Sequence, residues 1–368
     1  MRFLQILILI GLISVGCNNA PQRSVAEIPD DFVPAYKVDP FWPKPLPGNW
    51  ILGQVSGVDV DSKDHICIIH RPGSVDANEG DPSWFSKELL VVPAPPVLEF
   101  DAEGNLVGSW GGPGEGYQWP DLEHGIFVDG DNNIWISGAG SNDHQVLKFT
   151  SDGQFLLQIG QSGKTGGSND TELLGHPAEF DVDMDNKEVY IADGYLNKRV
   201  IVFDSETGKY KRHWGAYGNV PDDSVQPPYD PASPPSQQFG GVVHAVRISN
   251  DNLVYVCDRS NNRIQVFQKE GTFIKEGVVA PDTGGAGCAW DIDFSHDPGQ
   301  KYIFMADGTN QTVWVLERET LKVKDHFGRI GRYAGQFIWL HNITLDSHGN
   351  IYTAEVGTGK RVQKFNLQ

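Results

Sequence analysis

A short apolar motif recurs six times along the chain, and this repetition constrains the fold more than any other feature. Each copy alternates apolar and polar residues, which is typical of a half-buried β-strand. The six copies are SGVDVD at 56–61, HGIFVD at 124–129, AEFDVD at 178–183, HAVRIS at 244–249, WDIDFS at 290–295 and HNITLD at 341–346. Repetition of one small β unit predicts a closed ring of six blades.

Each repeat contains further strand patterns that are separated by turns rich in Asp, Asn and Gly. In repeat two we expect strands at 125–128, 134–137, 145–149 and 155–159. The sixth repeat has only three such patterns, so closure of the ring needs a strand from elsewhere. Residues 35–39 (AYKVD) are the expected donor, because pairing there would remove an open sheet edge. The prediction is an all-β, six-bladed β-propeller over residues 35–368 whose ring is closed by an N-terminal strand.

Two stretches interrupt the repeat, at 72–96 and at 219–238, and the second is rich in proline. We predict loops at both. Lids over one face of the ring and ordinary surface insertions are the two interpretations.

The N-terminal residues have the pattern of an export signal. An apolar run at 3–16 ends at Cys17, which predicts a signal peptide over 1–17 and a polar tether over 18–34. The residues before Cys17 resemble a bacterial lipoprotein box, although Ser14 stands where Leu is usual. Lipidation of Cys17, ordinary secretion and an uncleaved anchor are the alternatives. We therefore expect an exported protein, either a periplasmic or cell-surface lipoprotein or a secreted protein.

The formal net charge of the 368-residue chain is −19. This charge argues against nucleic acid as a partner and against electrostatic binding to anionic lipid, since both need a basic surface. We expect membrane contact only through the N-terminal lipid anchor, and a monomer. Cys67, Cys257 and Cys288 remain after processing, and an odd number cannot all pair within the chain. Buried, inert thiols are the interpretation that their strand-like surroundings favour.

Three histidines open alternate repeats. His124, His244 and His341 begin repeats two, four and six, which a sixfold ring relates by a threefold rotation. Their side chains should therefore converge on the axis. Three neutral imidazoles with an open fourth position are typical of catalytic zinc, although copper, iron and nickel also accept imidazole. The alternative is that each histidine packs against the channel and satisfies a backbone group.

Polar residues follow the second strand of three repeats and should lie on the same face as the histidines. They are Arg71, Tyr195 and Arg259. A guanidinium group binds a carboxylate with two hydrogen bonds, and a tyrosine beside a metal or an arginine can act as a base. The sequence therefore predicts a single site that combines metal, base and carboxylate recognition. Loop ion pairs and packing at the rim are the alternatives for these side chains.

Residues 50–365 resemble the peptidyl-α-hydroxyglycine α-amidating lyases, whose propellers are built from NHL-type repeats. The resemblance rests on a combination of motifs. These are Gly53–Val58 with His70-Arg71, Glu123-His124, Asp193-Gly194-Tyr195, Val243-His244, Asp258-Arg259 and Leu340-His341.

The resemblance implies a zinc-dependent carbon–nitrogen lyase. Such an enzyme cleaves a C-terminal α-hydroxyglycine to an amide and glyoxylate, so the substrate would be a small molecule or a peptide C-terminus that carries a carboxylate. It also implies that zinc holds the substrate hydroxyl, that Tyr195 is the base, that Arg71 activates Tyr195 and that Arg259 positions the carboxylate. A structural calcium ion is further implied, held by the backbone carbonyls of Val58 and Ile126 and by the side chain of Asn342.

The chain departs from the family pattern in three ways. Asn342 replaces the usual Asp after the third histidine, Trp339 replaces a Met, and the disulfide cysteines have no counterparts. Two other functions therefore stay open. One is a metal-dependent hydrolase or lactonase on a small substrate, and the other is a non-catalytic, exported binding propeller.

Overall fold

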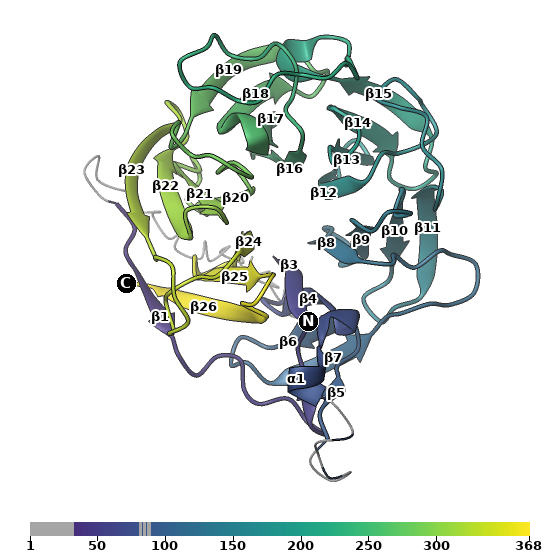
Figure 1. Ribbon diagram of the computed structural model, residues 1–368, viewed down its shortest axis with the longest axis vertical. Coiled ribbons are helices and arrows are strands. Elements are labelled where there is room, and N and C mark those ends of the chain that lie inside the picture. Colours follow the sequence, from purple (N-terminus) through teal and green to yellow (C-terminus); the bar gives the residue numbers. More distant parts are fainter. Residues whose placement is uncertain (1–32, 81–82, 84–85, 87–89) are drawn as a thin grey trace, which may run out of the picture. The chain divides into compact units, whose positions relative to one another are not determined.

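Strands dominate the structure, a computed structural model that describes residues 33–80, 83, 86 and 90–368. The predicted signal peptide at 1–17, with Cys17, and nearly all of the predicted tether lie outside these residues. Residues 34–368 form one unit, in which six four-stranded sheets stand around a central axis (Figure 1). The predicted all-β, six-bladed propeller is therefore confirmed.

The blades are numbered in the order of the repeats, and their strands run from the innermost to the outermost. Blade 1 contains β3 (Gln54–Val60), β4 (Ile66–Arg71), β6 (Val97–Phe100) and β7 (Leu106–Trp110); blade 2 contains β8 (Glu123–Val128), β9 (Ile134–Gly138), β10 (Gln145–Phe149) and β11 (Phe155–Gly160); blade 3 contains β12 (Pro177–Asp183), β13 (Glu188–Asp193), β14 (Arg199–Asp204) and β15 (Tyr210–Trp214). Blade 4 contains β16 (Val243–Ile248), β17 (Leu253–Asp258), β18 (Arg263–Gln268) and β19 (Phe273–Val278); blade 5 contains β20 (Asp291–Phe294), β21 (Tyr302–Asp307), β22 (Thr312–Glu317) and β23 (Lys322–Phe327); blade 6 contains β24 (Leu340–Leu345), β25 (Ile351–Glu355), β26 (Arg361–Leu367) and β1 (Tyr36–Asp39).

The closing strand is the one that the sequence predicts. β1 pairs antiparallel with β26, with Tyr36 opposite Leu367. The Tyr36 ring also packs against Phe304 and Phe327 of blade 5, with ring centroids 5.4 Å apart in both pairs. The two ends of the propeller are thereby held together, and β1 covers the outer edge of β26.

Local sequence explains the strand boundaries. Between β8 and β9, Asp129 accepts hydrogen bonds from the backbone N–H groups of Asp131 (3.0 Å) and Asn133 (2.8 Å), and Asn132 adopts φ 61°. Asp and Asn favour such turns because their side chains bond nearby backbone and tolerate positive φ. The polar sequence of β23 leaves nearly all of this outer strand exposed, whereas β13 is buried throughout.

Apolar side chains between neighbouring blades form the core. Blades 4 and 5, for example, share a cluster that includes Tyr255, Ile264, Ile303 and Met305. Burial of each such side chain contributes roughly 1.5–3 kcal/mol. The ring is therefore stabilised mainly by contacts between blades, and it fixes the positions of the inner strands around the axis.

The three cysteines among the described residues are free and buried, as expected. Burial raises the pKa of the Cys67 and Cys257 thiols, which keeps them protonated and unreactive. None of the helices in the described part of the chain has the length and apolar character needed to cross a membrane.

The loops predicted at 72–96 and 219–238 differ in structure. The first contains a 3₁₀ turn η1 (Pro72–Ser74), a single helical turn α1 (Ala77–Gly80) and β5 (Val92–Pro93), which pairs in parallel with β2 (Trp50–Ile51). The second has no regular element and follows the 3₁₀ turn η2 (Ala216–Gly218). A further 3₁₀ turn, η3 (Arg259–Asn261), follows β17.

Candidate functional site

The three predicted histidines meet on the axis of the propeller. Each is the second residue of an innermost strand, β8, β16 or β24. One ring nitrogen from each of His124, His244 and His341 can be chosen so that all three lie within 4.8 Å of one another. The ring centroids are 4.7–5.1 Å apart, and the side chains are almost fully buried. Alternate blades thus bring together three potential metal ligands.

Backbone carbonyls of the neighbouring blades orient two of these imidazoles. His244 Nδ1 lies 2.5 Å from the carbonyl oxygen of Trp290, and His341 Nδ1 lies 2.6 Å from that of Ser56. Since a carbonyl only accepts, Nδ1 must carry the proton in both residues, which leaves the Nε2 lone pair free. His244 Nε2 is buried and has no hydrogen-bond partner among the described residues. A buried nitrogen left in this state is what a metal ligand requires before the ion binds.

His124 departs from this pattern for a local reason. The equivalent acceptor would be the carbonyl of Ala178, but this oxygen accepts a hydrogen bond from Ser137 Oγ at 2.5 Å. His124 Nδ1 instead lies 3.7 Å from Glu179 Oε1, and both residues are fully buried. Neither His124 Nδ1 nor the two Glu179 side-chain oxygens have a hydrogen-bond partner among the described residues, and burial raises the pKa of Glu179 well above its ordinary value.

The electrostatic surroundings keep the histidines neutral. Burial lowers the pKa of His341 to about 3 and that of His124 and His244 well below the ordinary value. The positive charge of Arg259 lowers all three pKa values further. The neutral imidazole is the form that coordinates divalent ions, so the three histidines are candidate metal ligands.

Tyr195 and Arg259 lie beside the histidines, as the repeat positions predict. The Tyr195 hydroxyl is 2.9 Å from His124 Nε2 and 3.4 Å from Arg259 Nη1. The Arg259 guanidinium lies over the Trp290 ring, with 4.2 Å between Cζ and the ring centroid. A phenol and a cation therefore face the point at which the imidazoles converge.

Arg71 approaches the same group from blade 1. Its Nε donates to the carbonyl of Glu123 (2.7 Å), the residue before His124, and its Nη1 donates to Gln54 Oε1 (2.8 Å). Burial lowers the pKa of this guanidinium, and its interactions with Tyr195 and Glu123 act in the opposite direction. The structure thus brings all six predicted residues, three histidines and three polar side chains, into one region.

Buried ion pairs fix the turns that carry Tyr195 and Arg259. Asp193 ends β13 and bonds Arg199 Nε at 2.9 Å, and Asp258 ends β17 and bonds Arg263 Nε at 2.7 Å. An aspartate at the end of the second strand and an arginine at the start of the third clamp the intervening turn in both blades. Charge-assisted hydrogen bonds of this kind hold a turn firmly.

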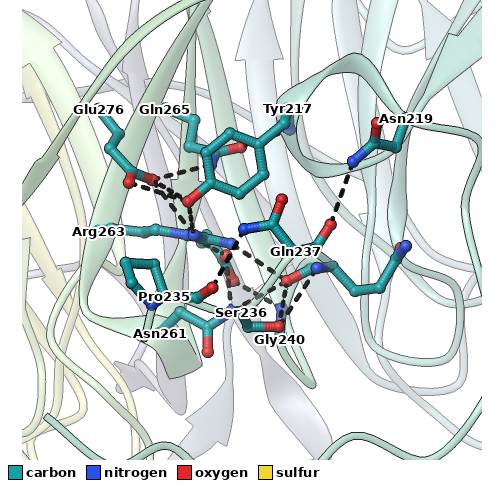
Figure 2. Close-up of polar contacts among 12 residues, drawn as sticks. Tyr217, Asn219, Pro235, Ser236, Gln237, Gly240, Asn261, Arg263, Gln265 and Glu276 are labelled. Carbon is teal, nitrogen blue, oxygen red and sulfur yellow. Dashed lines mark hydrogen bonds and ion pairs between the residues drawn. The ribbon is translucent and has the colours of Figure 1, made fainter. Parts of the chain in front are cut away.

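Arg263 also anchors the proline-rich loop at 219–238. Its Nη1 donates to Tyr217 (2.8 Å) and lies 3.2 Å from Glu276 Oε2 (Figure 2). Its Nη2 donates to the carbonyl of Gln238 (3.1 Å), where the loop returns to blade 4. The loop forms one wall of an open groove of about 560 Å³ that also contacts Ser260, the neighbour of Arg259. None of the six site residues lines this groove.

Three features of the site were not predicted from the sequence. Trp290 orients His244 through its carbonyl and carries Arg259 on its face. Glu179 lies buried 3.7 Å from His124, and Arg247 forms a buried ion pair with Asp291 at 3.2 Å. The repeat alignment could have pointed to Trp290, because Trp290 opens its repeat at the position that histidine occupies in repeats two, four and six.

Of the residues expected to hold calcium, Asn342 is hydrogen-bonded within the protein. Asn342 Oδ1 accepts a hydrogen bond from the backbone N–H of Val58 (2.7 Å), and Asn342 Nδ2 donates to Asp291 Oδ2 (2.5 Å). The amide is therefore used on both sides by the protein. Ile126 lies buried on β8, and Arg247 brings a positive charge to the same region. We derive no role for calcium in this chain.

Comparison with known proteins agrees with the geometry. The NHL repeat pattern matches residues 243–267, which span β16 to β18. The chain is 29% identical over 312 residues to the probable peptidyl-α-hydroxyglycine α-amidating lyase of Caenorhabditis elegans, covering 83% of this chain and 80% of that protein. The chain is an NHL-repeat propeller with homologues among the amidating lyases. It is also 30% identical over 335 residues to the peptidyl-glycine α-amidating monooxygenase of Mus musculus, covering 87% of this chain.

The coverage and the names of the relatives limit which functions can be inferred from the sequence similarity. This NHL-repeat chain spans 31% of the length of the Mus musculus monooxygenase, so the activity of that whole protein does not transfer directly. NHL repeat-containing protein 3 of Mus musculus is 28% identical, over 90% of this chain and 84% of that protein. The solved structure of a streptogramin B lyase has a TM-score of 0.53 and 12% identity, covering 90% of this chain and 98% of that one, which shows a common fold alone.

Proposed function

We propose that this NHL-repeat propeller is a metal-dependent lyase that cleaves a C-terminal α-hydroxyglycine to an amide and glyoxylate, with zinc as the metal. One observation carries the proposal. Three neutral, buried imidazoles converge within 4.8 Å, and a tyrosine hydroxyl lies 2.9 Å from one of them. The homology to amidating lyases supports the same reaction class.

The donor set fits a divalent ion of the zinc type. It consists of three nitrogen ligands, two of them oriented through Nδ1, with one Nε2 buried and unpartnered among the described residues. A zinc ion bound there would supply a positive charge that acidifies a hydroxyl group at its open position. Imidazole nitrogen suits zinc, copper, iron or nickel better than magnesium or calcium.

The protein side chains then perform recognition and proton transfer. Arg259 lies on Trp290 with its guanidinium directed at Tyr195, so it can bind the substrate carboxylate while Tyr195 faces the hydroxyl. Tyr195, which lies beside Arg259, accepts the hydroxyl proton. The carbon–oxygen double bond of glyoxylate forms, the carbon–nitrogen bond breaks, and the nitrogen takes the electron pair and a proton to become the amide.

The decisive experiment measures glyoxylate release from an α-hydroxyglycine peptide by the purified chain and its Tyr195→Phe variant. We expect turnover by the wild type and a loss of about 10²–10⁴-fold in kcat for the variant, because a general base contributes roughly that factor. Metal content, measured by elemental analysis, should be equal in the two proteins. Tyr333→Phe is the control, since Tyr333 is 81% exposed.

Two other outcomes would point to other functions. Turnover of lactones or esters without glyoxylate release would favour a metal-dependent hydrolase on the same site. Absence of bound transition metal and of turnover would favour a binding propeller without catalysis, a role that the similarity to NHL repeat-containing protein 3 leaves available.

We also propose that the protein is exported and anchored through a lipid on Cys17, as a monomer. The N-terminal sequence is the support for this proposal. Metabolic labelling with a fatty acid would test it. Label on the wild type and none on the Cys17→Ala variant is the expected result, whereas unlabelled, secreted wild-type protein would contradict it.

A further inference from the structure

Trp339 is a large apolar side chain that stands exposed beside the histidine site. It is 42% exposed and lies two residues before His341. Its backbone has φ 55°, and its carbonyl accepts a hydrogen bond from the N–H of Val356 at 3.0 Å. His176, at the equivalent position of blade 3, shares the positive φ. Blades 3 and 6 therefore share this backbone conformation, and the exposed indole is found in blade 6.

The neighbouring chain leaves room for this indole. A Cβ atom added to Gly357 would lie 2.5 Å from Trp339 Cδ1, so only glycine permits the observed packing. Gly357 itself has φ 57°, where glycine is favoured. The Trp339 ring is thus held against the backbone of blade 6 and is not a freely moving surface side chain.

Trp339 continues an aromatic surface that begins at the metal ligands. Trp290 lies 5.5 Å from His244, 5.6 Å from His341 and 5.9 Å from Trp339, between ring centroids. The Trp290 ring is fixed by a hydrogen bond from Nε1 to the Gly287 carbonyl (2.8 Å) and is 5% exposed. Two indoles therefore lead from the buried histidines to solvent.

The cation that recognises a carboxylate lies on the same surface. Arg259 Cζ is 4.2 Å from the Trp290 centroid, so a carboxylate held by Arg259 is necessarily close to this indole. In the proposed reaction the metal, Tyr195 and Arg259 hold the hydroxyglycine part of the substrate. The acyl group on the nitrogen, beyond the carbon–nitrogen bond that breaks, is left without a binding partner among these groups. Exposed aromatic area beside a charged anchor is suited to a flat apolar group.

We propose that Trp339, with Trp290, forms a binding wall for an aromatic or large apolar acyl group, so that the chain prefers hydroxyglycine amides with such a group, including peptides whose preceding residue is aromatic. The proposal rests on the proposed lyase function for the position of the substrate. Trp339 acts as a specificity-determining residue. Stacking on an indole corresponds to roughly a 3- to 10-fold gain in affinity.

The kinetic test compares N-benzoyl-α-hydroxyglycine with N-acetyl-α-hydroxyglycine. For the wild type we expect kcat/KM to be about tenfold higher for the benzoyl substrate. In Trp339→Ala this preference should largely disappear through a higher KM for the benzoyl substrate, with a smaller change in KM for the acetyl substrate. Trp339→Met should give an intermediate preference, and Tyr333→Ala should behave as the wild type. Thermal midpoint and metal content should match in all four proteins.

A binding test separates this proposal from the lyase assignment. N-benzoylglycine and N-acetylglycine lack the reactive hydroxyl, so calorimetry measures their binding without turnover. Tighter binding of the benzoyl compound by the wild type, lost in Trp339→Ala, supports the aromatic wall even if no hydroxyglycine compound is cleaved. An equal preference in the wild type and Trp339→Ala, in both assays, overturns the wall and leaves the lyase assignment standing wherever glyoxylate is released.

Discussion

The inner strands carry two sets of three polar residues, one of histidines and one of aspartates, each drawn from alternate blades. The two sets differ in whether all of their side-chain polar atoms have hydrogen-bond partners. Both use one side chain from every second inner strand, and they are three positions apart in the repeat. The histidine layer comprises His124, His244 and His341 of blades 2, 4 and 6, and the aspartate layer comprises Asp59, Asp181 and Asp293 of blades 1, 3 and 5.

The aspartate layer is fully used by the protein. In each residue one carboxylate oxygen accepts the N–H of the next residue in the same strand, and the other accepts an N–H of the following blade. These contacts between blades join Val128 to Asp59 (2.6 Å), Ile248 to Asp181 (2.7 Å) and Leu345 to Asp293 (2.7 Å). The aspartates therefore tie each odd blade to the next even blade.

The histidine layer joins even blades to the next odd blades by hydrogen bonds, but one ring nitrogen is left out of these bonds. His244 and His341 each bond a carbonyl of the next odd blade through Nδ1, and Nε2 is left for the axis. The histidine side chains are almost fully buried, whereas the three aspartates are only half-buried. The difference is whether every polar atom has a partner within the fold.

Removing a histidine should give the largest effect on activity. His244→Ala leaves two nitrogens, too few to hold the ion, and we expect the bound zinc to fall from about one per chain to almost none. Activity on a hydroxyglycine substrate should drop by roughly 10³-fold or more, because a metal ion supplies several kcal/mol of transition-state stabilisation. Elemental analysis and a glyoxylate assay measure both quantities.

His348→Ala is the matched control, since the His348 side chain is 75% exposed and lies outside the channel layers. It should retain metal and activity. Retention of a full complement of zinc by His244→Ala would show that the histidine layer is not the metal site.

Arg247 lies between the two layers, and its removal should give the largest loss of stability. Its guanidinium is 3.2 Å from Asp291 and donates to the Phe180 carbonyl at 3.0 Å. Burial lowers the pKa of this guanidinium, and the nearby acidic groups, Asp291 and Glu179 foremost, raise it above its ordinary value. In Arg247→Met we expect the free energy of unfolding to fall by about 3–5 kcal/mol, as for other buried ion pairs that lose one partner.

Urea unfolding monitored by tryptophan fluorescence would measure this change. Lys187→Met removes an ion pair with Glu206 that is exposed at both ends, and it should change little. Because Asn342 is hydrogen-bonded to Val58 and Asp291, and Arg247 already brings a positive charge to Asp291, calcium or a calcium chelator should not shift the wild-type midpoint. A large stabilisation of the wild type by calcium would contradict this view of the channel.

His70 provides a histidine with both nitrogens satisfied, in contrast to the histidine layer. Gly53 N–H donates to Nδ1 (3.1 Å), and Nε2 lies 3.0 Å from the Pro95 carbonyl. Burial lowers the pKa of His70 from 6.5 to about 4. Between these pH values the unfolded chain binds a proton that the folded chain does not, so the free energy of unfolding should decrease as pH falls from 6.5 to 4. This contribution is on the order of 3 kcal/mol.

Urea unfolding of the wild type and His70→Asn at several pH values would isolate the effect, since all other titrating groups are common to both. The difference between the two proteins should be largest at pH 7 and should shrink towards pH 4. Parallel pH curves would show that His70 contributes nothing to the acid sensitivity of the fold.

The sequence contained enough information for the fold and for the convergence of the histidines, because both depend on repeat position alone. A residue that opens an innermost strand must face the axis, whatever its neighbours are. The same reasoning placed Tyr195 and Arg259 near His124. It could not foresee that Asn342 is used by Val58 and Asp291, or that Arg247 lies among carboxylates. Those features depend on which long side chain reaches which partner across the channel.

Asp293 offers the finest test of the contrast between the layers. Asp293→Ala leaves the N–H of Leu345 without its acceptor (2.7 Å in the wild type), inside the channel. An unsatisfied buried donor costs about 1–3 kcal/mol, so we expect a loss of that size in the free energy of unfolding and an unchanged metal content. Asp325→Ala is the control, because Asp325 accepts the N–H of His326 in the same way but on the exposed strand β23. Loss of metal from Asp293→Ala would mean that the aspartate layer positions the histidines and that the two layers act as one structure.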